Sequence, residues 1–168
     1  MEVFGLAGWS GSGKTTLIKR LIPFLTDRGI SVSTIKHAHH NFDIDEPGKD
    51  SFGHRLAGAD EVLISSKNRW AIIHENKGFM EPELSDLLRK LSPVNLVLVE
   101  GFKNTKFKKL EIYRDANKKP LLHKNDTNIC AVASDIGLTN IEVPVFDLDD
   151  IKTISEFIMQ NTGLLETL

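Results

Sequence analysis

Residues 8–16 read GWSGSGKTT, and this stretch constrains the fold more than any other part of the sequence. It matches the pattern G-x-x-x-x-G-K-[ST], with Gly8, Gly13, Lys14 and Thr15 at the fixed positions. Glycines allow positive φ and let backbone N–H groups approach a phosphate. The lysine then reaches the β- and γ-phosphates, and the threonine hydroxyl ligates Mg²⁺. The stretch therefore predicts a phosphate-binding P-loop.

The residues on both sides of the loop fit this interpretation. The apolar run at 2–7 predicts a buried strand, and apolar residues with helical spacing follow the loop. The motif requires this context, because the N-terminus of the helix adds unpaired N–H groups and the positive end of its dipole. The predicted nucleotide contacts in the loop are Gly8, Ser10, Gly11, Ser12, Gly13, Lys14, Thr15 and Thr16.

Strands and helices alternate along most of the chain. The patterns predict strands at 2–7, 32–36, 61–65, 70–74, 96–100, 110–113, 129–133 and 143–146, and helices at 14–28, 51–56, 82–91 and 151–159. Central strands that are apolar throughout indicate a mainly parallel sheet covered on both faces. The predicted fold class is α/β, a three-layer P-loop NTPase fold with an antiparallel β-hairpin extension that we expect at an edge of the sheet.

Length and composition narrow the class of protein. A chain of 168 residues predicts a single domain spanning residues 1–168. The net charge of −2 argues against broad nucleic-acid binding. No apolar stretch approaches the ~18 residues of a membrane span, and the N-terminus lacks the basic region of a signal peptide. The single cysteine, Cys130, cannot form an internal disulfide, so we expect a cytoplasmic protein. From the net charge and the lack of a long apolar stretch, we expect no nucleic-acid or membrane partner.

A second unusual stretch, at 36–51, reads KHAHHNFDIDEPGKDS. It follows the second predicted strand, at the sheet edge where open α/β proteins bind ligands. One interpretation is a solvated polar loop, and another is a loop in which Asp43 or Asp45 contributes oxygen ligands to Mg²⁺. A transition-metal site is a third interpretation. The histidines available for it are His37, His39 and His40.

Two further acidic residues follow apolar strands. The segment NLVLVEG has the form of a Walker B strand, and we expect Glu100 at its end to hold a Mg²⁺-bound water. For base recognition, HKND at 123–126 only approximates the guanine motif N/T-K-x-D and precedes a strand. Asp135 directly follows a strand, where its carboxylate could accept hydrogen bonds from guanine N1–H and N2–H. The predicted Mg²⁺ ligands are Thr15, Glu100 and Asp45.

Together these motifs resemble the molybdopterin-guanine dinucleotide biosynthesis protein B (MobB) family. The discriminating part is the block KHxHHxFDxDxPGKDS within 36–51, because many unrelated proteins share a P-loop. The likeness spans nearly the whole chain. It is also carried by GWSGSGKTT at 8–16, NRWA at 68–71, VEGFK at 99–103 and AVASD at 131–135.

The resemblance implies a GTP-binding accessory protein of molybdenum cofactor biosynthesis, with weak intrinsic GTPase activity and with GTP and Mg²⁺ as cofactors. The implied partner is the guanylyltransferase that joins GMP to molybdopterin, with molybdopterin itself or the molybdenum insertion protein as further partners. By position, Lys14 and Thr15 take the phosphate and Mg²⁺ roles and Glu100 takes the Walker B role. Asp45 and Arg69 become candidates beside the phosphates.

Two alternatives from other classes stay open. A P-loop small-molecule kinase fits the length, although the six arginines form no lid-like cluster in the sequence. A metallochaperone GTPase would use the histidines at 37, 39 and 40 as metal ligands. The segment 103–124, with eight basic and two acidic residues, is either a solvated surface or a patch for an anionic ligand.

The predicted hairpin also bears on assembly. It presents apolar residues at alternating positions, and a two-stranded ribbon is marginally stable alone. The sequence and the resemblance both favour a homodimer with the hairpin at its interface, which would place Arg69 of the turn near a phosphate site. The apolar residues expected at this interface are Val62, Ile64, Trp70 and Ile72.

Overall fold

The computed structural model describes residues 1–38, 42–78 and 80–167. The chain divides into two compact units, the first formed by Met1–His37 with Leu87–Leu168 and the second by Ala38–Asp86. The assignment of residues 1–168 to a single domain remains a prediction.

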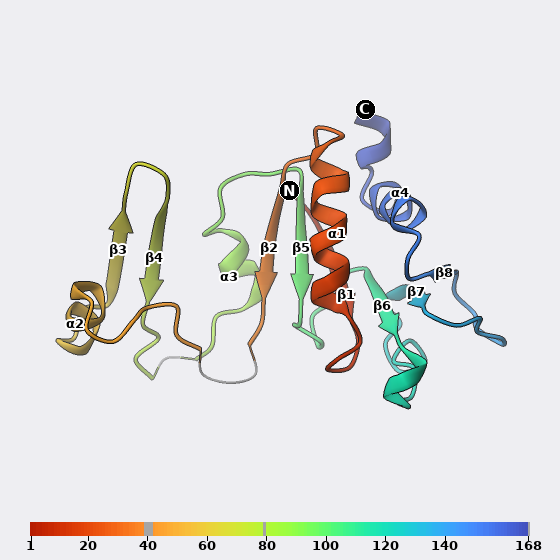
Figure 1. Cartoon of the computed structure of the whole chain (residues 1–168), viewed down its shortest axis with the longest axis horizontal. Coiled ribbons are helices and arrows are strands. Elements are labelled where there is room, and N and C mark those ends of the chain that lie inside the picture. Colours follow the sequence, from red (N-terminus) through yellow and green to blue (C-terminus); the bar gives the residue numbers. More distant parts are fainter. Residues whose placement is uncertain (39–41, 79, 168) are drawn as a thin grey trace. The chain divides into compact units, whose positions relative to one another are not determined.

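The first unit is built on a six-stranded sheet with the order β2-β5-β1-β6-β7-β8, in which every neighbouring pair is parallel (Figure 1). This confirms the predicted parallel sheet. Because β1 lies between β5 and β6, the loop after β1 leaves the sheet at the carboxyl ends of these two neighbours. The strands are β1 (Glu2–Ala7), β2 (Val32–Lys36), β5 (Leu96–Glu100), β6 (Lys109–Tyr113), β7 (Ile129–Ser134) and β8 (Val145–Asp147).

Two helices, α1 (Lys14–Thr26) and α4 (Ile151–Asn161), pack against each other and share one core with the sheet. Their buried residues recur every three or four positions, as expected for an apolar stripe on a helix. This core positions α1, and with it the loop that precedes it. Its helical members include Leu17, Leu21, Leu25, Ile154 and Ile158, and its strand members include Phe4, Leu6, Leu96, Leu98, Leu110 and Ile112.

The C-terminal end of α1 differs slightly from the sequence prediction. The helix ends at Thr26 and not at Arg28, three residues beyond Pro23, which lies inside it. Gly29 has φ of +77°, and the Ile30 N–H donates to the Leu25 carbonyl at 3.2 Å. These contacts form a Schellman cap, with the glycine in the left-handed conformation that this cap requires.

The second unit contains α2 (Asp50–Leu56) and a hairpin of β3 (Glu61–Ser65) and β4 (Trp70–His74). The hairpin is antiparallel as predicted, with Ser65 opposite Trp70 and a four-residue polar turn between them. In the described residues it forms a sheet of its own, so its expected place at an edge of the main sheet is wrong. Helix α3 (Leu84–Leu88) spans the point where the chain passes between the two units.

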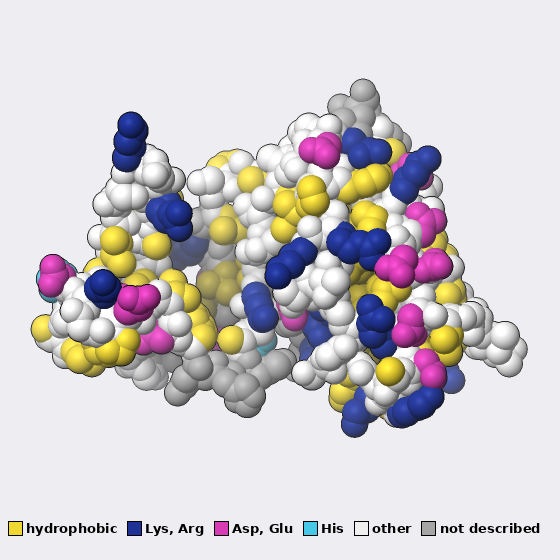
Figure 2. Space-filling view, in the orientation of Figure 1, with side chains coloured by type: hydrophobic (Ala, Val, Ile, Leu, Met, Phe, Trp, Pro, Cys, Tyr) yellow, Lys and Arg dark blue, Asp and Glu magenta, His cyan; other side chains and the backbone are white. Residues whose placement is uncertain are grey.

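One face of the hairpin exposes apolar side chains, and Figure 2 shows hydrophobic surface in the region of α2 and the hairpin. Leu63 and Ile72 are paired across the strands and are 61% and 47% exposed, and Trp70 on the same face is 63% exposed. Val62, which was predicted to be available on this ribbon, is buried, and its strand partner is Ile73. Ile64, also predicted at the interface, is 42% exposed on the opposite face, so the exposed apolar side chains of this face are those of Leu63, Trp70 and Ile72.

Within the described ranges, every helix is too short or too polar to cross a membrane. The remaining short elements are two 3₁₀ helices of the first unit, η1 (Asp115–Asn117) and η2 (Leu164–Thr167).

Candidate functional site

The backbone of the P-loop adopts the conformation that the sequence predicts. Gly8, Gly11 and Gly13 have φ of +149°, +79° and +99°, which side chains rarely allow. A Cβ on Gly8 would lie 2.5 Å from the Ser12 hydroxyl and 2.7 Å from the Ile112 carbonyl oxygen. Glycine is therefore required at position 8 by both the backbone angle and the close approach of β6.

Lys14 lies across this loop. Its Nζ donates to the carbonyl oxygens of Gly8 at 2.9 Å and of Trp9 at 3.0 Å. Burial lowers the pKa of the Lys14 ammonium below its ordinary value, the Glu100 carboxylate opposes this shift, and the Lys103 and Lys36 cations add to it. The ammonium is thus held at the loop by carbonyl groups that an anion could replace. The basic neighbours that affect its pKa are Lys36 and Lys103.

Glu100 ends β5, where the Walker B prediction places it. In the sheet register it is opposite Leu6 of β1 and Lys36 of β2, so it lies one strand from the beginning of the P-loop. The next residue, Gly101, has φ of +101°, and a Cβ there would lie 2.5 Å from Cβ of His37. This tight turn fixes the backbone that carries the Glu100 carboxylate.

Two features of the loop fit a bound polyphosphate. The Ser12 hydroxyl is buried and has no hydrogen-bond partner in the part of the chain that the structure describes. The N-terminus of α1 begins at Lys14 after Gly13, and its cap residue provides no side-chain hydrogen bond to the first turn. Unpaired donors at the start of a 13-residue helix are the usual setting for an anion.

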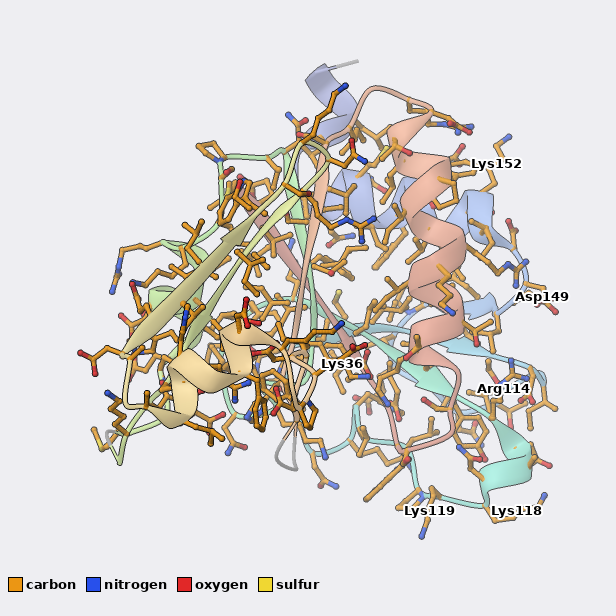
Figure 3. All side chains as sticks on the ribbon, turned by 60° about the vertical axis from the view of Figure 1, so that its left-hand side comes forward. Lys36, Arg114, Lys118, Lys119, Asp149 and Lys152 are labelled. Carbon is orange, nitrogen blue, oxygen red and sulfur yellow. The ribbon has the colours of Figure 1, made fainter. Side chains whose placement is uncertain are left out.

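The sequence analysis missed Arg114, which directly follows β6. Its Nε donates to the Ser12 carbonyl oxygen at 3.2 Å, and the guanidinium lies against Gly13. Figure 3 shows Arg114 beside the end of β6, with Lys118 and Lys119 around η1. A signal was available, because β6 was predicted as a strand of a parallel sheet and its carboxyl end must lie at the ligand edge.

Asp135, the predicted base reader, follows β7 and lies beside Arg114. Its Oδ1 accepts a hydrogen bond from the Asp115 N–H at 3.0 Å, and its Oδ2 lies 3.7 Å from Nη1 of Arg114. Arg114 therefore contacts both Asp135 and Ser12 of the P-loop, which places Asp135 near the loop. Its role in base recognition remains a prediction.

The segment after Arg114 contacts the outer side of the P-loop at two more points. The Trp9 indole N–H donates to the Pro120 carbonyl at 2.8 Å, and the Lys119 ammonium lies 5.8 Å from the centre of the Trp9 ring. The Asn117 amide donates to the Ser10 carbonyl at 3.5 Å. The segment 114–120 therefore supports the loop from the β6 side.

The HKND sequence has a structural role in this fold. Lys109 is 2% exposed, and its Nζ donates to Asp126 Oδ2 and to the Lys103 carbonyl, both at 2.8 Å. Hydrogen bonds from Lys109 and Asn128 hold the pKa of Asp126 below its ordinary value, although burial alone would raise it. Asp126 is thus a partner of a buried lysine, in agreement with the preference for Asp135 as the base reader.

Asp45 belongs to the second unit, where it takes part in a group of charged residues around Arg55. The Arg55 guanidinium contacts Asp43 at 2.7 Å, Asp45 at 3.5 Å and Glu75 at 2.7 Å. The Asp45 carboxylate is 5% exposed and also accepts a hydrogen bond from the Ser51 hydroxyl at 2.8 Å. Its predicted place beside the phosphates and the metal remains a prediction.

Arg69, the other candidate carried over from the resemblance, closes the hairpin turn. Its carbonyl accepts hydrogen bonds from the Ser66 N–H at 2.8 Å and the Ser66 hydroxyl at 3.0 Å. Its side chain is exposed at the tip of the ribbon. The backbone contacts explain the turn, and the predicted phosphate contact of the side chain remains a prediction.

Mg²⁺ binding was predicted, and a transition-metal site was one of three interpretations of the stretch at 36–51. Among residues 1–38, 42–78 and 80–167, no group of three or more His, Cys, Asp or Glu side chains is arranged to hold a metal ion. His37 stacks on Phe102 with ring centroids 4.7 Å apart. His39 and His40 lie outside the described residues, and the Mg²⁺ roles of Thr15, Glu100 and Asp45 remain predictions.

Comparisons with known proteins agree with the motifs. The model of the family "Molybdopterin guanine dinucleotide synthesis protein B" matches residues 3–135. The chain is 41% identical to the molybdopterin-guanine dinucleotide biosynthesis adapter protein of Escherichia coli, covering 95% of this chain and 93% of that protein. It is 40% identical to the Haemophilus influenzae protein of the same name, covering 94% and 88%.

The fold is similar to that of a solved structure. The X-ray crystal structure of a MobB protein homolog from Bacillus stearothermophilus superposes with a TM-score of 0.71 over 97% of this chain and 99% of that chain. The sequences are 24% identical, so this likeness concerns the fold alone.

Proposed function

This chain belongs to the molybdopterin guanine dinucleotide synthesis protein B family, and on that premise we propose that it is an adapter protein of molybdopterin guanine dinucleotide biosynthesis that binds GTP and Mg²⁺ at its P-loop. The observation that carries the proposal is the geometry of Lys14. Its ammonium is held by two carbonyl groups of the glycine loop, and Glu100 ends the adjacent strand opposite Leu6.

Residues of the chain have distinct parts in this binding. Lys14 and the N–H groups at the start of α1 bind the phosphates, while the Thr15 hydroxyl and Glu100 hold Mg²⁺ or its waters. Bound Mg²⁺ supplies charge neutralisation at the phosphates. We expect slow hydrolysis, because the only glutamine of the chain, Gln160, lies on α4 and is not placed to orient a water.

The proposal also covers partners and location. Names of the relatives support a role beside the enzymes of this pathway, so the partner is the guanylyltransferase that joins GMP to molybdopterin, with molybdopterin or the molybdenum insertion protein as further partners. The protein acts in the cytoplasm. It is a homodimer through the exposed hairpin face of Leu63, Trp70 and Ile72, because such a face on a two-stranded sheet favours pairing.

Calorimetry with Mg²⁺ tests the nucleotide site. We expect GTP to bind more tightly than ATP, and Lys14→Ala to weaken GTP binding by about 100-fold or more, because a charged contact to phosphate is lost. Lys19→Ala is the matched control, since Lys19 is an exposed lysine of the same helix. Full binding by Lys14→Ala would show that the P-loop is not the site, and tighter binding of ATP would remove the guanine part.

Two measurements test the assembly. Light scattering is expected to give twice the 18.8 kDa of one chain, and Ile72→Glu is expected to give monomers. A pull-down with and without GTP, probed for the guanylyltransferase, tests the partner. A monomeric wild-type protein contradicts the homodimer and leaves the nucleotide proposal standing.

A further inference from the structure

The P-loop lies between two groups of charged residues at the carboxyl edge of the first unit's sheet. On the β5 side, Glu100 ends the strand next to β1, opposite Leu6. Arg114 and Asp135 follow β6 and β7 on the other side. A nucleotide whose terminal phosphates face Glu100 therefore extends its ribose and base toward the ends of β6 and β7.

The Arg114 guanidinium is held in place but keeps donors available. Nε donates to the Ser12 carbonyl at 3.2 Å, and an ideal Cβ on Gly13 would lie 3.2 Å from Nε and 3.5 Å from Nη2. The side chain is 38% exposed. Within the described residues, Nη1 and Nη2 donate no hydrogen bond, since Asp135 is 3.7 Å away. The fork of donors is thus oriented by the loop and open to a ligand.

The Asp135 carboxylate has an orienting contact besides its 3.7 Å ion pair with Arg114. The Asp115 N–H donates to Oδ1 at 3.0 Å, which fixes the side chain against η1. The other oxygen, Oδ2, accepts no hydrogen bond in the described part of the chain, and the side chain is 29% exposed. An open donor fork and an open acceptor therefore stand next to each other beside the P-loop.

This arrangement complements one purine. Guanine presents O6 and N7 as acceptors, and arginine binds this pair bidentately. Its N1–H and N2–H groups are the donors that a carboxylate accepts, and N1–H is adjacent to O6 as Asp135 is to Arg114. Adenine presents an amino group where guanine has O6 and an unprotonated N1, so it would place donor against donor and acceptor against acceptor.

We propose that Arg114 is a specificity-determining residue of the nucleotide site, which donates to O6 and N7 of guanine while Asp135 accepts from N1–H and N2–H. This inference rests on the proposed function, because it concerns the nucleoside end of the same ligand. Arg114 also supports the P-loop through its hydrogen bond to the Ser12 carbonyl. If this support were its only role, Arg114→Ala would weaken the binding of GTP, ATP and inorganic triphosphate equally.

The test measures dissociation constants of wild type, Arg114→Ala and Arg114→Lys for four ligands with Mg²⁺. They are GTP, 7-deaza-GTP, ATP and inorganic triphosphate. Arg114→Ala is expected to weaken GTP binding roughly 10-fold to 100-fold and to weaken ATP and inorganic triphosphate binding much less, because the loss of the Ser12 contact affects all three ligands while the loss of the guanine contacts affects GTP alone. Wild type binds 7-deaza-GTP, which lacks the N7 acceptor, more weakly than GTP. In Arg114→Ala this difference disappears.

Two control variants and one comparison on the wild type keep the result interpretable. Arg28→Ala, two residues beyond the C-terminal end of α1, removes an exposed arginine and leaves all four affinities unchanged. Arg114→Lys keeps the charge without the fork and is expected to recover only part of the preference for GTP. If Arg114→Ala does not fold by circular dichroism, the comparison of GTP with 7-deaza-GTP on wild type still tests the N7 contact.

The outcomes separate this inference from the proposed function. Equal weakening of GTP, ATP and inorganic triphosphate by Arg114→Ala shows a brace of the loop and overturns the base contact. Equal wild-type affinities for GTP and 7-deaza-GTP overturn it too. Failure of the proposed function looks different, since wild type would then bind no nucleotide or Lys14→Ala would bind normally.

Discussion

Each unit of this protein contains an arginine among aspartates, and the two arginines differ in how fully they are satisfied. Arg55 of the second unit donates through Nε to Glu75 and through Nη1 to Asp43, with Asp45 also in contact. Arg114 of the first unit donates only through Nε, to a backbone carbonyl, and its nearest carboxylate is 3.7 Å away. The first arrangement holds a fold together, and the second has capacity left for a ligand.

The difference follows from what surrounds each group. The second unit buries few apolar side chains in its described residues, with Val62 in the hairpin as one of them, so its charged residues stabilise it by pairing with each other. The first unit has a large apolar core in which α1, α4 and the sheet meet. That core already stabilises the edge of the sheet. The charged residues there, Arg114 and Asp135, therefore need not pair fully with each other and can bind a ligand.

The largest expected effect is on the scaffold of the first unit. Lys109→Ala removes a buried ammonium that joins Asp126 to the Lys103 carbonyl, and it leaves Asp126 without that partner. The free energy of unfolding, measured with urea, is expected to fall by about 3–5 kcal/mol. Lys108→Ala, its exposed neighbour, is the control and should change stability little. A loss as small as that of the control would contradict the structural role of the pair.

The next largest effect is expected on nucleotide binding by the group of Arg114 and Asp135. Asp135→Asn replaces one carboxylate oxygen by an amide donor, which opposes guanine N2–H but matches the C2 carbonyl of xanthine. GTP binding is expected to weaken roughly 10-fold to 100-fold, while XTP binding becomes tighter. The matched variant Asp43→Asn, in the saturated group, leaves the ratio of GTP to XTP affinity unchanged. An unchanged ratio in Asp135→Asn as well would exclude Asp135 from the base site.

Much of the first unit could be predicted because its elements have strong local signals. The strands at 2–7, 32–36 and 96–100 have the predicted bounds. In the first and the last of them, a mostly apolar run ends at a glycine or at a charged residue. The P-loop follows from its glycines and Lys14 by the same local argument. The hairpin could be recognised from its alternation and polar turn, while its separation from the main sheet depends on long-range pairing that no local pattern encodes.

The sequence did not reveal the contacts of Arg114 and Asp45, and the physical cause is the same for both. Arg114 has no motif of its own, and its place beside Ser12 results from strand order, which brings β6 next to β1. Asp45 has a clear motif, yet the motif does not reveal that Arg55 and Ser51 already contact its carboxylate. Sequence patterns identify polar residues near an edge, but the hydrogen bonds that remain available depend on the folded contacts.

A smaller, local effect is expected from Arg55→Met, which leaves Asp43, Asp45 and Glu75 without their common partner. Amide hydrogen exchange is expected to become faster in α2 and in the hairpin, while protection of β1, β5 and α1 stays the same. Lys67→Ala, at the exposed hairpin turn, is the control. Faster exchange throughout the first unit would contradict the division of tasks between the two groups.

The smallest effect concerns acid, and the two tryptophans allow it to be measured for each unit. Trp9 lies in the P-loop and Trp70 in the hairpin, so Trp70→Phe reports on the first unit and Trp9→Phe on the second. Hydrogen bonds from Arg55 hold the pKa of Asp43 below its ordinary value, and those from Lys109 and Asn128 do the same for Asp126 against the effect of burial.

The sign of the pH dependence follows from these lowered values. Each carboxylate binds protons more readily in the unfolded chain, so its contribution to stability is full above its ordinary pKa of about 4 and is lost as the pH falls through the lower folded value. Asp43→Asn is therefore expected to make the acid transition seen by Trp70 shallower below pH ~4 and to leave that of Trp9 unchanged. Equal slopes in the variant and the wild type for Trp70 would show that Arg55 does not favour the charged form of Asp43, and the contrast between the two arginines would then rest on geometry alone.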